Sequence, residues 1–171
     1  MSDCRNQNVQ AGILGIPEQC MRRKDRETTD TEEMELILNA APVCRLGMAD
    51  SGEPYVVPLC FGYEAGSLYI HSATEGEKIA ILRKNPRVCV EVDLTAGPIP
   101  SEEPCSWEMH YKSVICRGNA VFLTGSDEKR KALCCILRHY GASPDPFTED
   151  SLAKVCVIRI DIDRMTGKKH G

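Results

Sequence analysis

The sequence is poor in aromatic residues and contains no long apolar run. Its 171 residues include one Trp, five Tyr and three Phe. No stretch approaches the roughly 18 apolar residues that mark a membrane-spanning helix. The polar first ten residues also do not follow the pattern of a secretory signal. The sequence therefore predicts a cytoplasmic protein with no membrane partner.

An excess of charge of one sign is also missing. The chain has 21 Lys and Arg residues against 25 Asp and Glu residues, a formal net charge of −4. A chain of this kind has no overall field that attracts nucleic acid, so no nucleic-acid partner is predicted. At roughly 100–200 residues per domain, the length predicts one domain. We place it at residues 21–171, after a flexible N-terminal extension over residues 1–20.

Nucleotide-binding glycine motifs and metal-binding cysteine motifs are absent. There is no GxGxxG after a predicted strand and no GxxxxGK[ST]. Cysteine is abundant, with ten residues, but without CxxC spacing no metal site is predicted. A redox switch or chelator at the adjacent Cys134 and Cys135 is disfavoured, because neighbouring helical side chains point about 100° apart. We expect reduced thiols, and we expect those in apolar strand-like runs to be buried: Cys44, Cys60, Cys89, Cys116 and Cys156.

Hydrophobic periodicity predicts strands in hairpin order with a few helices. One predicted helix begins after an Asp30 cap and ends before Pro42. Two further helices are predicted over Gly76–Lys84 and Ser126–Tyr140. The predicted strands are Cys44–Ala49, Tyr55–Tyr63, Ser67–Ser72, Arg87–Asp93, Trp107–Leu123 (two strands, or one bent at Gly118) and Val155–Ile162. Thr95–Pro104 and Ala142–Asp150 are predicted loops, and Thr166–Lys169 a basic tail. This order favours a mainly β, antiparallel barrel over a Rossmann sheet.

The segment Leu68–Lys78 is the most informative part of the chain. Strand alternation means that His71 need not point into the core. The chain then enters the start of a helix, where free N–H groups and the helix dipole favour an anion. Gly76 permits close backbone approach and Lys78 adds a positive charge, so the segment predicts a phosphate-monoester site. The alternative is that Thr74 is only an N-cap and Lys78 only a surface lysine.

Several short motifs, in this order and spacing, resemble one known family. They are Met21–Glu27, Cys44–Leu46, Pro54–Leu59 with Phe61–Tyr63, Leu68–Ala73 with Gly76 and Lys78, Asn85–Val88, Tyr111–Val114, Glu128-Lys129 and Thr166–Lys169. The sequence resembles the pyridoxamine 5′-phosphate oxidase-related flavoproteins, and within them the nitroimidazole-resistance (Nim-like) branch. The resemblance covers about residues 21–169.

The resemblance implies a fold, a cofactor and an assembly. The fold is an antiparallel six-stranded split β-barrel with two or three flanking helices. It forms a homodimer with one FMN, or alternatively FAD, in each of two clefts between the subunits. The implied cofactor-binding residues are Val57, Pro58 and Leu59 along the isoalloxazine ring; Ile70, His71, Ser72 and Ala73 at the ring and ribityl chain; Gly76 and Lys78 at the phosphate; and Tyr111, Ser113 and Val114, from the same chain or its partner, completing the cleft.

Three residues near these motifs have both a structural and a functional interpretation. Pro58 has no N–H group, so its strand should lie at an edge or a bulge, where backbone groups could meet a flavin. We expect Arg45 to pair with Glu91 or Asp93 in preference to the cofactor. Trp107 either covers the flavin or fills the core.

The resemblance also implies a flavin-dependent oxidoreductase, similar to a nitroreductase or to pyridoxamine-phosphate oxidase. Flavin reduced by NAD(P)H would pass two electrons to a small molecule such as a nitroaromatic. His71 is the candidate catalytic residue, because an imidazole beside the flavin could give the acceptor a proton or a hydrogen bond; alternatively it only positions the cofactor. The alternative function is a flavin- or haem-binding protein without turnover. Vitamin B6 synthesis is not predicted, because the extra Arg and His contacts of true oxidases have no match.

Overall fold

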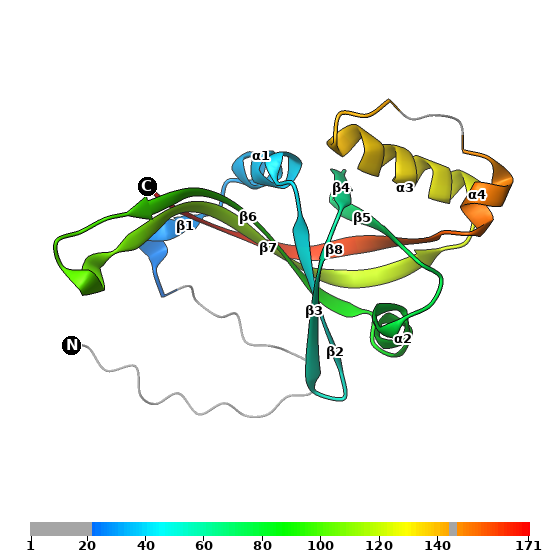
Figure 1. The fold of residues 1–171 in the computed structure, drawn as a ribbon, viewed down its shortest axis with the longest axis horizontal. Helices are drawn as coiled ribbons and strands as arrows, with labels where there is room; N and C mark the ends of the chain where they lie inside the picture. The colour runs from blue at the N-terminus through cyan, green and yellow to red at the C-terminus, as the bar shows by residue number, and fades with distance from the viewer. Residues whose placement is uncertain (1–21, 144–146) are drawn as a thin grey trace.

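The computed structural model describes residues 22–143 and 147–171. The predicted extension over residues 1–20, and Met21, lie outside the described residues. Within them the chain forms the strands β1 (Glu27–Thr28), β2 (Cys44–Asp50), β3 (Glu53–Leu59), β4 (Phe61–Glu64), β5 (Ser67–Ser72), β6 (Arg87–Ile99), β7 (Glu108–Leu123) and β8 (Cys156–His170). The helices are α1 (Thr31–Ala40), α2 (Glu77–Lys84), α3 (Ser126–His139) and α4 (Glu149–Ala153), with the 3-10 turns η1 (Lys24–Arg26) and η2 (Pro104–Ser106) (Figure 1).

The strands form one antiparallel sheet in the order β3-β2-β6-β7-β8-β5-β4, with β1 added on β8. The edge strands β3 and β4 are consecutive in the chain and are separated only by Cys60. The open sheet must therefore curl until its two edges approach each other at this residue. The mainly β, antiparallel prediction is confirmed, but the described sheet has eight strands and not six.

Two predicted strands have different limits in the structure. Tyr55–Tyr63 is not one strand, because it breaks at Cys60, where the chain passes from one edge of the sheet to the other. The predicted segment Trp107–Leu123 forms one strand, β7, which has a register shift beside Gly118. A Cβ atom on Gly118 would lie 2.1 Å from the carbonyl oxygen of Asp161, so the backbones can approach this closely only at a glycine.

Long-range pairing extends β6 and β8 beyond their predicted ends. Thr95–Pro104 is not all loop, because β6 continues to Ile99 along β7. Thr166–Lys169 is not a free tail, because it pairs with β7 and with β1. The predicted loop Ala142–Asp150 also contains the start of α4. These segments have weak strand or helix signals of their own, and their partners determine their structure.

Helix α1 begins at the predicted cap. The Asp30 carboxylate accepts hydrogen bonds from the N–H groups of Glu32 and Glu33. The Glu33 side chain does not complete a capping box; it accepts hydrogen bonds from the Thr28 hydroxyl at 2.6 Å and from Lys169 Nζ at 2.8 Å. These contacts join α1 to β1 and to the end of β8.

The core consists of two clusters on opposite faces of β5 and β8. The larger one fills the inside of the curled sheet and includes Phe61, Leu68, Ile70, Val114 and Ile158. The smaller one packs α3 and α4 against the outer face and includes Leu133, Ile136, Leu152 and Val157, with Tyr69 beside them. Strand alternation then places His71 on the same outer face as Tyr69.

Gly62 in β4 sets the distance between the sheet and α3. An added Cβ would lie 2.8 Å from the backbone of both Cys135 and Ile136. We expect Gly62→Ala to displace α3 and to lower the free energy of unfolding by about 1–3 kcal/mol, as overpacking does elsewhere. Gly125→Ala is the control, since its new Cβ would meet only the flexible Glu128 side chain. Equal stability of the two variants in urea would show that this contact does not position α3.

Candidate functional site

Helix α2 begins without a side-chain cap. Gly76 is the N-cap residue, with φ 122°, and no side chain in the described part of the chain accepts a hydrogen bond at this helix start. Thr74 is therefore not the N-cap, so that part of the alternative is wrong. The N–H groups of the first turn remain available to an anionic ligand.

Lys78 lies in this first turn and is half-buried. Burial lowers the pKa of its ammonium group from the ordinary value, and the nearby Cys156 and Cys44 partly offset this effect. Within residues 22–143 and 147–171 no hydrogen bond or ion pair to Lys78 is formed, whereas Lys84 at the other end of α2 binds Asp50 at 2.6 Å. A partly desolvated cation without a counter-charge is costly. Lys78 is therefore placed to bind an anion.

Strand register brings two more predicted residues to the Lys78 end of the sheet. Leu59 of β3 pairs with Cys44, and Ser72 of β5 pairs with Cys156. Cys44 and Cys156 are the two thiols that partly offset the effect of burial on the pKa of Lys78. Leu59, Ser72 and Lys78 therefore gather where the two edges of the sheet meet. The neighbouring Pro58 lies in the edge strand β3, as its missing N–H group predicted.

His71 opens into an apolar pocket on the outer face of β5. The pocket has a volume of about 280 Å³ and lies between β5, α3 and α4. Its other lining residues are Leu133, Ile136, Leu137, Phe147, Ser151 and Val155. A pocket with apolar walls and one imidazole suits a small apolar molecule that needs a single hydrogen-bond partner. These lining residues could not be recognised from the sequence, because apolar positions on a helix usually indicate core.

Tyr111 lies far from His71 along the sheet. His71 pairs with Val157, which pairs with Leu123 of β7. Tyr111 precedes Leu123 by twelve residues in the same strand, and at about 3.3 Å per residue this separation is about 40 Å along the strand. One chain therefore does not bring His71 and Tyr111 into a single cleft.

Burial determines which predicted residues could offer a side chain to a ligand. Ile70 and Val114 are fully buried in the core, so only their backbone atoms could contact a cofactor. Trp107 is 56% exposed, and its Nε1 donates a hydrogen bond to the Ser101 carbonyl at 2.9 Å. The core-filling alternative for Trp107 is therefore wrong. The other predicted site residues are exposed or half-buried: Val57, Pro58, Leu59, His71, Ser72, Ala73, Gly76, Lys78, Tyr111 and Ser113.

Arg45 forms the predicted ion pairs on the outer face of the sheet. Its Nη1 donates to Glu91 at 2.8 Å and also to Asp93. Its charge is therefore already matched by residues of β6, and the structural interpretation of Arg45 is confirmed.

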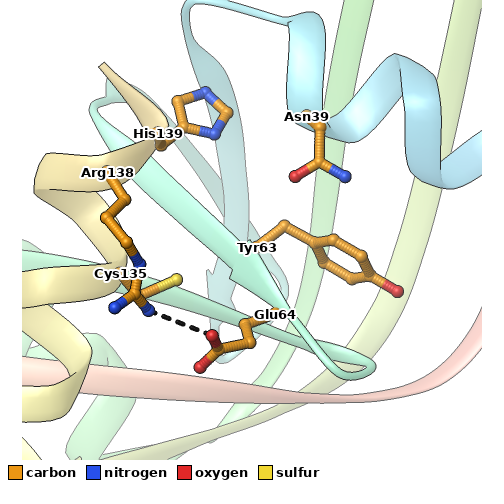
Figure 2. A pocket seen from close by; sticks show the side chains of 6 residues that line it. All are labelled: Asn39, Tyr63, Glu64, Cys135, Arg138 and His139. Atoms are coloured by element: carbon orange, nitrogen blue, oxygen red, sulfur yellow. Dashed lines mark hydrogen bonds and ion pairs between the residues drawn. The ribbon is translucent and has the colours of Figure 1, made fainter. Parts of the chain in front are cut away.

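A second, polar pocket lies between α1, β4 and α3, with a volume of about 250 Å³ (Figure 2). Arg138, which lines it, pairs with Glu64 at 3.0 Å. The Tyr63 hydroxyl donates to Glu35, and His139 Nε2 lies 2.8 Å from the Ala41 carbonyl oxygen. Because these polar groups already have protein partners and none is a predicted site residue, we assign no ligand to this pocket.

The described thiols are all free and only partly follow the expected burial. Cys44 and Cys116 are buried, and burial raises the pKa of each thiol to about 12. Cys156 is half-buried, but Cys60 and Cys89 are exposed. Cys89 is on the outer face of β6 and Cys60 lies between two strands, so the prediction that they are buried is wrong. Among the described residues no group of three His, Cys, Asp or Glu side chains is placed to hold a metal ion.

Native thiol titration should separate these classes. At equal pH, a thiol with a pKa near 12 has about 1,000-fold less thiolate than an ordinary one. We therefore expect Cys60→Ser and Cys89→Ser each to remove one fast-reacting thiol in the disulfide-exchange reaction with DTNB. Cys116→Ser should change only the total measured after unfolding. If Cys116→Ser instead removed one fast-reacting thiol, the result would show that strand β7 opens in solution.

The fold and this region define a mainly antiparallel β protein in which helix α2 begins without a side-chain cap. No helix of the described residues has the length and apolar character to cross a membrane. The model of the pyridoxamine 5′-phosphate oxidase family matches residues 30–169. The chain therefore belongs to the pyridoxamine 5′-phosphate oxidase family.

Several solved structures are similar to this chain. The chain is 38% identical to a Bacteroides thetaiotaomicron protein described as a candidate 5-nitroimidazole antibiotic resistance protein, with a TM-score of 0.75 over 83% of this chain and 85% of that one. It is 30% identical to an FAD-binding protein from Mesorhizobium loti, with a TM-score of 0.61 over 83% and 96% of the two chains. A flavocytochrome from Azotobacter vinelandii, at 20% identity, shares the fold with a TM-score of 0.78 over 89% and 72%.

One curated sequence also matches part of the chain. An uncharacterized Rhizobium meliloti protein is 31% identical over 61 residues, which are 36% of this chain and 40% of that protein. The match spans less than half of either protein.

Proposed function

We propose that this protein is an FMN-dependent oxidoreductase that acts as a homodimer, with one flavin in each of two clefts between the subunits. Flavin reduced by NAD(P)H would reduce a small acceptor such as a nitroaromatic. The observation that carries the proposal is the uncapped start of α2, with the half-buried Lys78 in its first turn, which has no hydrogen-bond or ion-pair partner among the described residues. Family membership and the names of two relatives, one an FAD-binding protein and one linked to 5-nitroimidazole resistance, support it.

The residues at this end of the sheet fit a flavin mononucleotide. A phosphate monoester carries about −1.5 to −2 charges at neutral pH. Lys78 supplies one positive charge, and the helix start adds roughly half a charge and several N–H donors. Val57 and Leu59, both half-buried in β3, provide an apolar edge for the ring system. We favour FMN over FAD because one compact anion site suits a monophosphate.

The bound flavin would supply the two-electron chemistry, and the protein would supply binding, orientation and a proton. Lys78 and the α2 amides hold the phosphate, which fixes the cofactor relative to β3 and β5. The His71 imidazole lines the opening of the apolar pocket, where it would donate a hydrogen bond or a proton to a polar atom of the acceptor. The walls of the pocket, including Leu133 and Val155, keep water away from the acceptor.

Anaerobic titration tests this function. NADH or NADPH should bleach the flavin of the purified dimer, and a nitroaromatic added afterwards should restore the oxidised spectrum. The restoration should require one two-electron equivalent of acceptor per flavin. A bound flavin that responds to neither nicotinamide nor acceptor would contradict the oxidoreductase proposal and would identify a non-catalytic flavin-binding protein.

A further inference from the structure

A β-bulge in β8 places two consecutive charged side chains on the outer face of the sheet. Arg117 of β7 pairs with Arg164, whereas the next residue, Gly118, pairs with Ile162. Ile162 and Met165 both pack against the core inside the curled sheet, so Asp163 and Arg164 between them face outwards. Bulges re-aim side chains in this way and are frequent beside functional sites.

The bulge makes Arg164 the direct cross-strand partner of Arg117. The Arg117 side chain also faces outwards, because its neighbours Cys116 and Gly118 in β7 are buried. The Cβ atoms of such partners lie about 4.5–5.5 Å apart, and like charges in this position destabilise a sheet. The two arginines therefore need a counter-charge.

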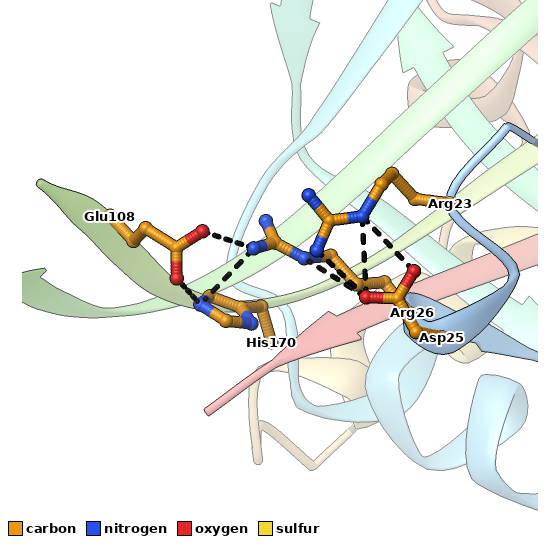
Figure 3. A network of polar contacts seen from close by, with 5 residues as sticks. All are labelled: Arg23, Asp25, Arg26, Glu108 and His170. Atoms are coloured by element: carbon orange, nitrogen blue, oxygen red, sulfur yellow. Dashed lines mark hydrogen bonds and ion pairs between the residues drawn. The ribbon is translucent and has the colours of Figure 1, made fainter. Parts of the chain in front are cut away.

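Other arginines of the strands obtain their counter-charge from the sheet itself. Arg45 binds Glu91 and Asp93, Arg87 binds Asp163, and Arg159 binds Asp161. Arg23 and Arg26, beside η1, are also paired, with Asp25 and Glu108 (Figure 3). Among the residues that the structure describes, no carboxylate pairs with Arg117 or Arg164. A counter-charge for these two must come from outside the described chain.

The neighbouring positions in the same row of the sheet are small and uncharged. Arg117 pairs with Cys89 of β6, and Cys89 pairs with Gly47 of β2. Cys89 is exposed, and Gly47 has no side chain. Neither residue offers a carboxylate to the guanidinium groups, and Arg164 is itself exposed. The pair is therefore accessible to a dissolved anion, in a chain whose formal net charge is −4.

The chemistry of the guanidinium group selects the kind of anion. Each group presents a planar fork of N–H donors that matches the oxygens of phosphate or carboxylate. A single carboxylate would neutralise only one of the two charges. A phosphate group carries about −1.5 to −2 charges at neutral pH, and its tetrahedral oxygens can accept from two forks at once. The arrangement therefore suits phosphate.

We propose that Arg117 and Arg164 form a binding site for a phosphate group on the outer face of the sheet. The site is distinct from the Lys78 region, because Lys78 lies beside Cys44 and Cys156, which belong to the core inside the curled sheet. The inference does not depend on the proposed flavin function. The same chemistry would recognise free phosphate and the phosphate group of a small molecule.

Urea unfolding with and without phosphate tests the site. All proteins carry Lys78→Met, so that phosphate at the start of α2 does not contribute, and sodium chloride at equal ionic strength is the reference. Phosphate should raise the unfolding midpoint above that in chloride, and the concentration dependence gives its affinity. Arg117→Gln and Arg164→Gln should each weaken this affinity by about 10-fold or more, the loss expected for a charge-assisted hydrogen bond. A parallel titration with glycerol phosphate distinguishes the two sources, because the tighter ligand identifies free phosphate or a phosphate ester.

The phosphate-free proteins give a second readout of opposite sign. Without an anion, Arg117→Gln and Arg164→Gln should each be more stable than the parent, because the repulsion between the two charges is removed. Arg159→Gln is the matched control, since Arg159 lies on β8 and on the same face but is paired with Asp161. It should gain no stability and should keep the phosphate affinity of the parent.

Three results would overturn the inference. One is a phosphate effect no larger than that of chloride, and another is a loss of stability on Arg117→Gln in phosphate-free buffer, which would show that Arg117 already has a counter-charge. The third is a Cys89 thiol that does not react with a neutral disulfide in the native protein, because this face of the sheet would then be covered.

Discussion

Lys78→Met should weaken FMN binding by about 10- to 100-fold, the loss expected when one charge-assisted hydrogen bond of roughly 1.5–3 kcal/mol is removed. The methionine keeps the apolar stem of the half-buried lysine and removes only its charge, so folding should be little affected. Equilibrium titration of the flavin-free protein with FMN, followed by flavin fluorescence, measures the change. Lys84→Met is the matched control, because it lies on the same helix but binds Asp50, and its FMN affinity should equal that of the wild type.

The same lysine should make FMN binding sensitive to alkaline pH. Burial lowers the pKa of the Lys78 ammonium, and only the protonated form attracts phosphate. FMN affinity should therefore fall as the pH rises through this lowered pKa, and the fall should be absent in Lys78→Met. An affinity that Lys78→Met leaves unchanged at every pH would show that the phosphate binds elsewhere.

His71→Gln should lower acceptor reduction by about 100-fold or more, the usual contribution of a positioned proton donor, while FMN binding stays close to that of the wild type. The reason is geometric. The His71 side chain opens into the apolar pocket beside α3 and α4, whereas the proposed phosphate site consists of Lys78 and the start of α2. Single-turnover reoxidation of reduced flavin by a nitroaromatic separates this step from reduction by the nicotinamide.

Tyr69→Phe is the control for His71, because Tyr69 lies on the same face of β5 and packs against the same two helices. It should leave both turnover and FMN affinity unchanged. If His71→Gln loses FMN affinity and turnover together, the imidazole positions the cofactor and does not protonate the acceptor.

Local signals in the sequence predicted the strand and the helix that carry one half of the candidate site. The β5 strand, the turn after it and the helix with Lys78 follow one another within a few residues, so strand alternation and helix-start chemistry describe them well. The edge position of Pro58 follows from its missing N–H group, and the Arg45 ion pairs follow from oppositely charged residues in neighbouring strands. Each of these features depends on short-range geometry.

Features that depend on long-range pairing were not predictable in the same way. The break at Cys60 exists because β3 and β4 lie on opposite edges of a curled sheet, which no local signal records. The extension of β6 to Ile99 depends on its pairing with β7, and Thr166–Lys169 becomes a strand because β7 and β1 accept it. For the same reason the sequence did not show that Tyr111 lies twelve residues along β7 from Leu123, which is in register with His71.

The central claim, that this chain holds a flavin, is tested most directly by the absorbance spectrum of the purified protein and the mass of the compound released from it on denaturation. We expect the yellow bands of an oxidised flavin, the mass of FMN and one cofactor for each chain. A haem Soret band without flavin bands would contradict the claim. A colourless protein that does not bind added FMN would contradict it equally.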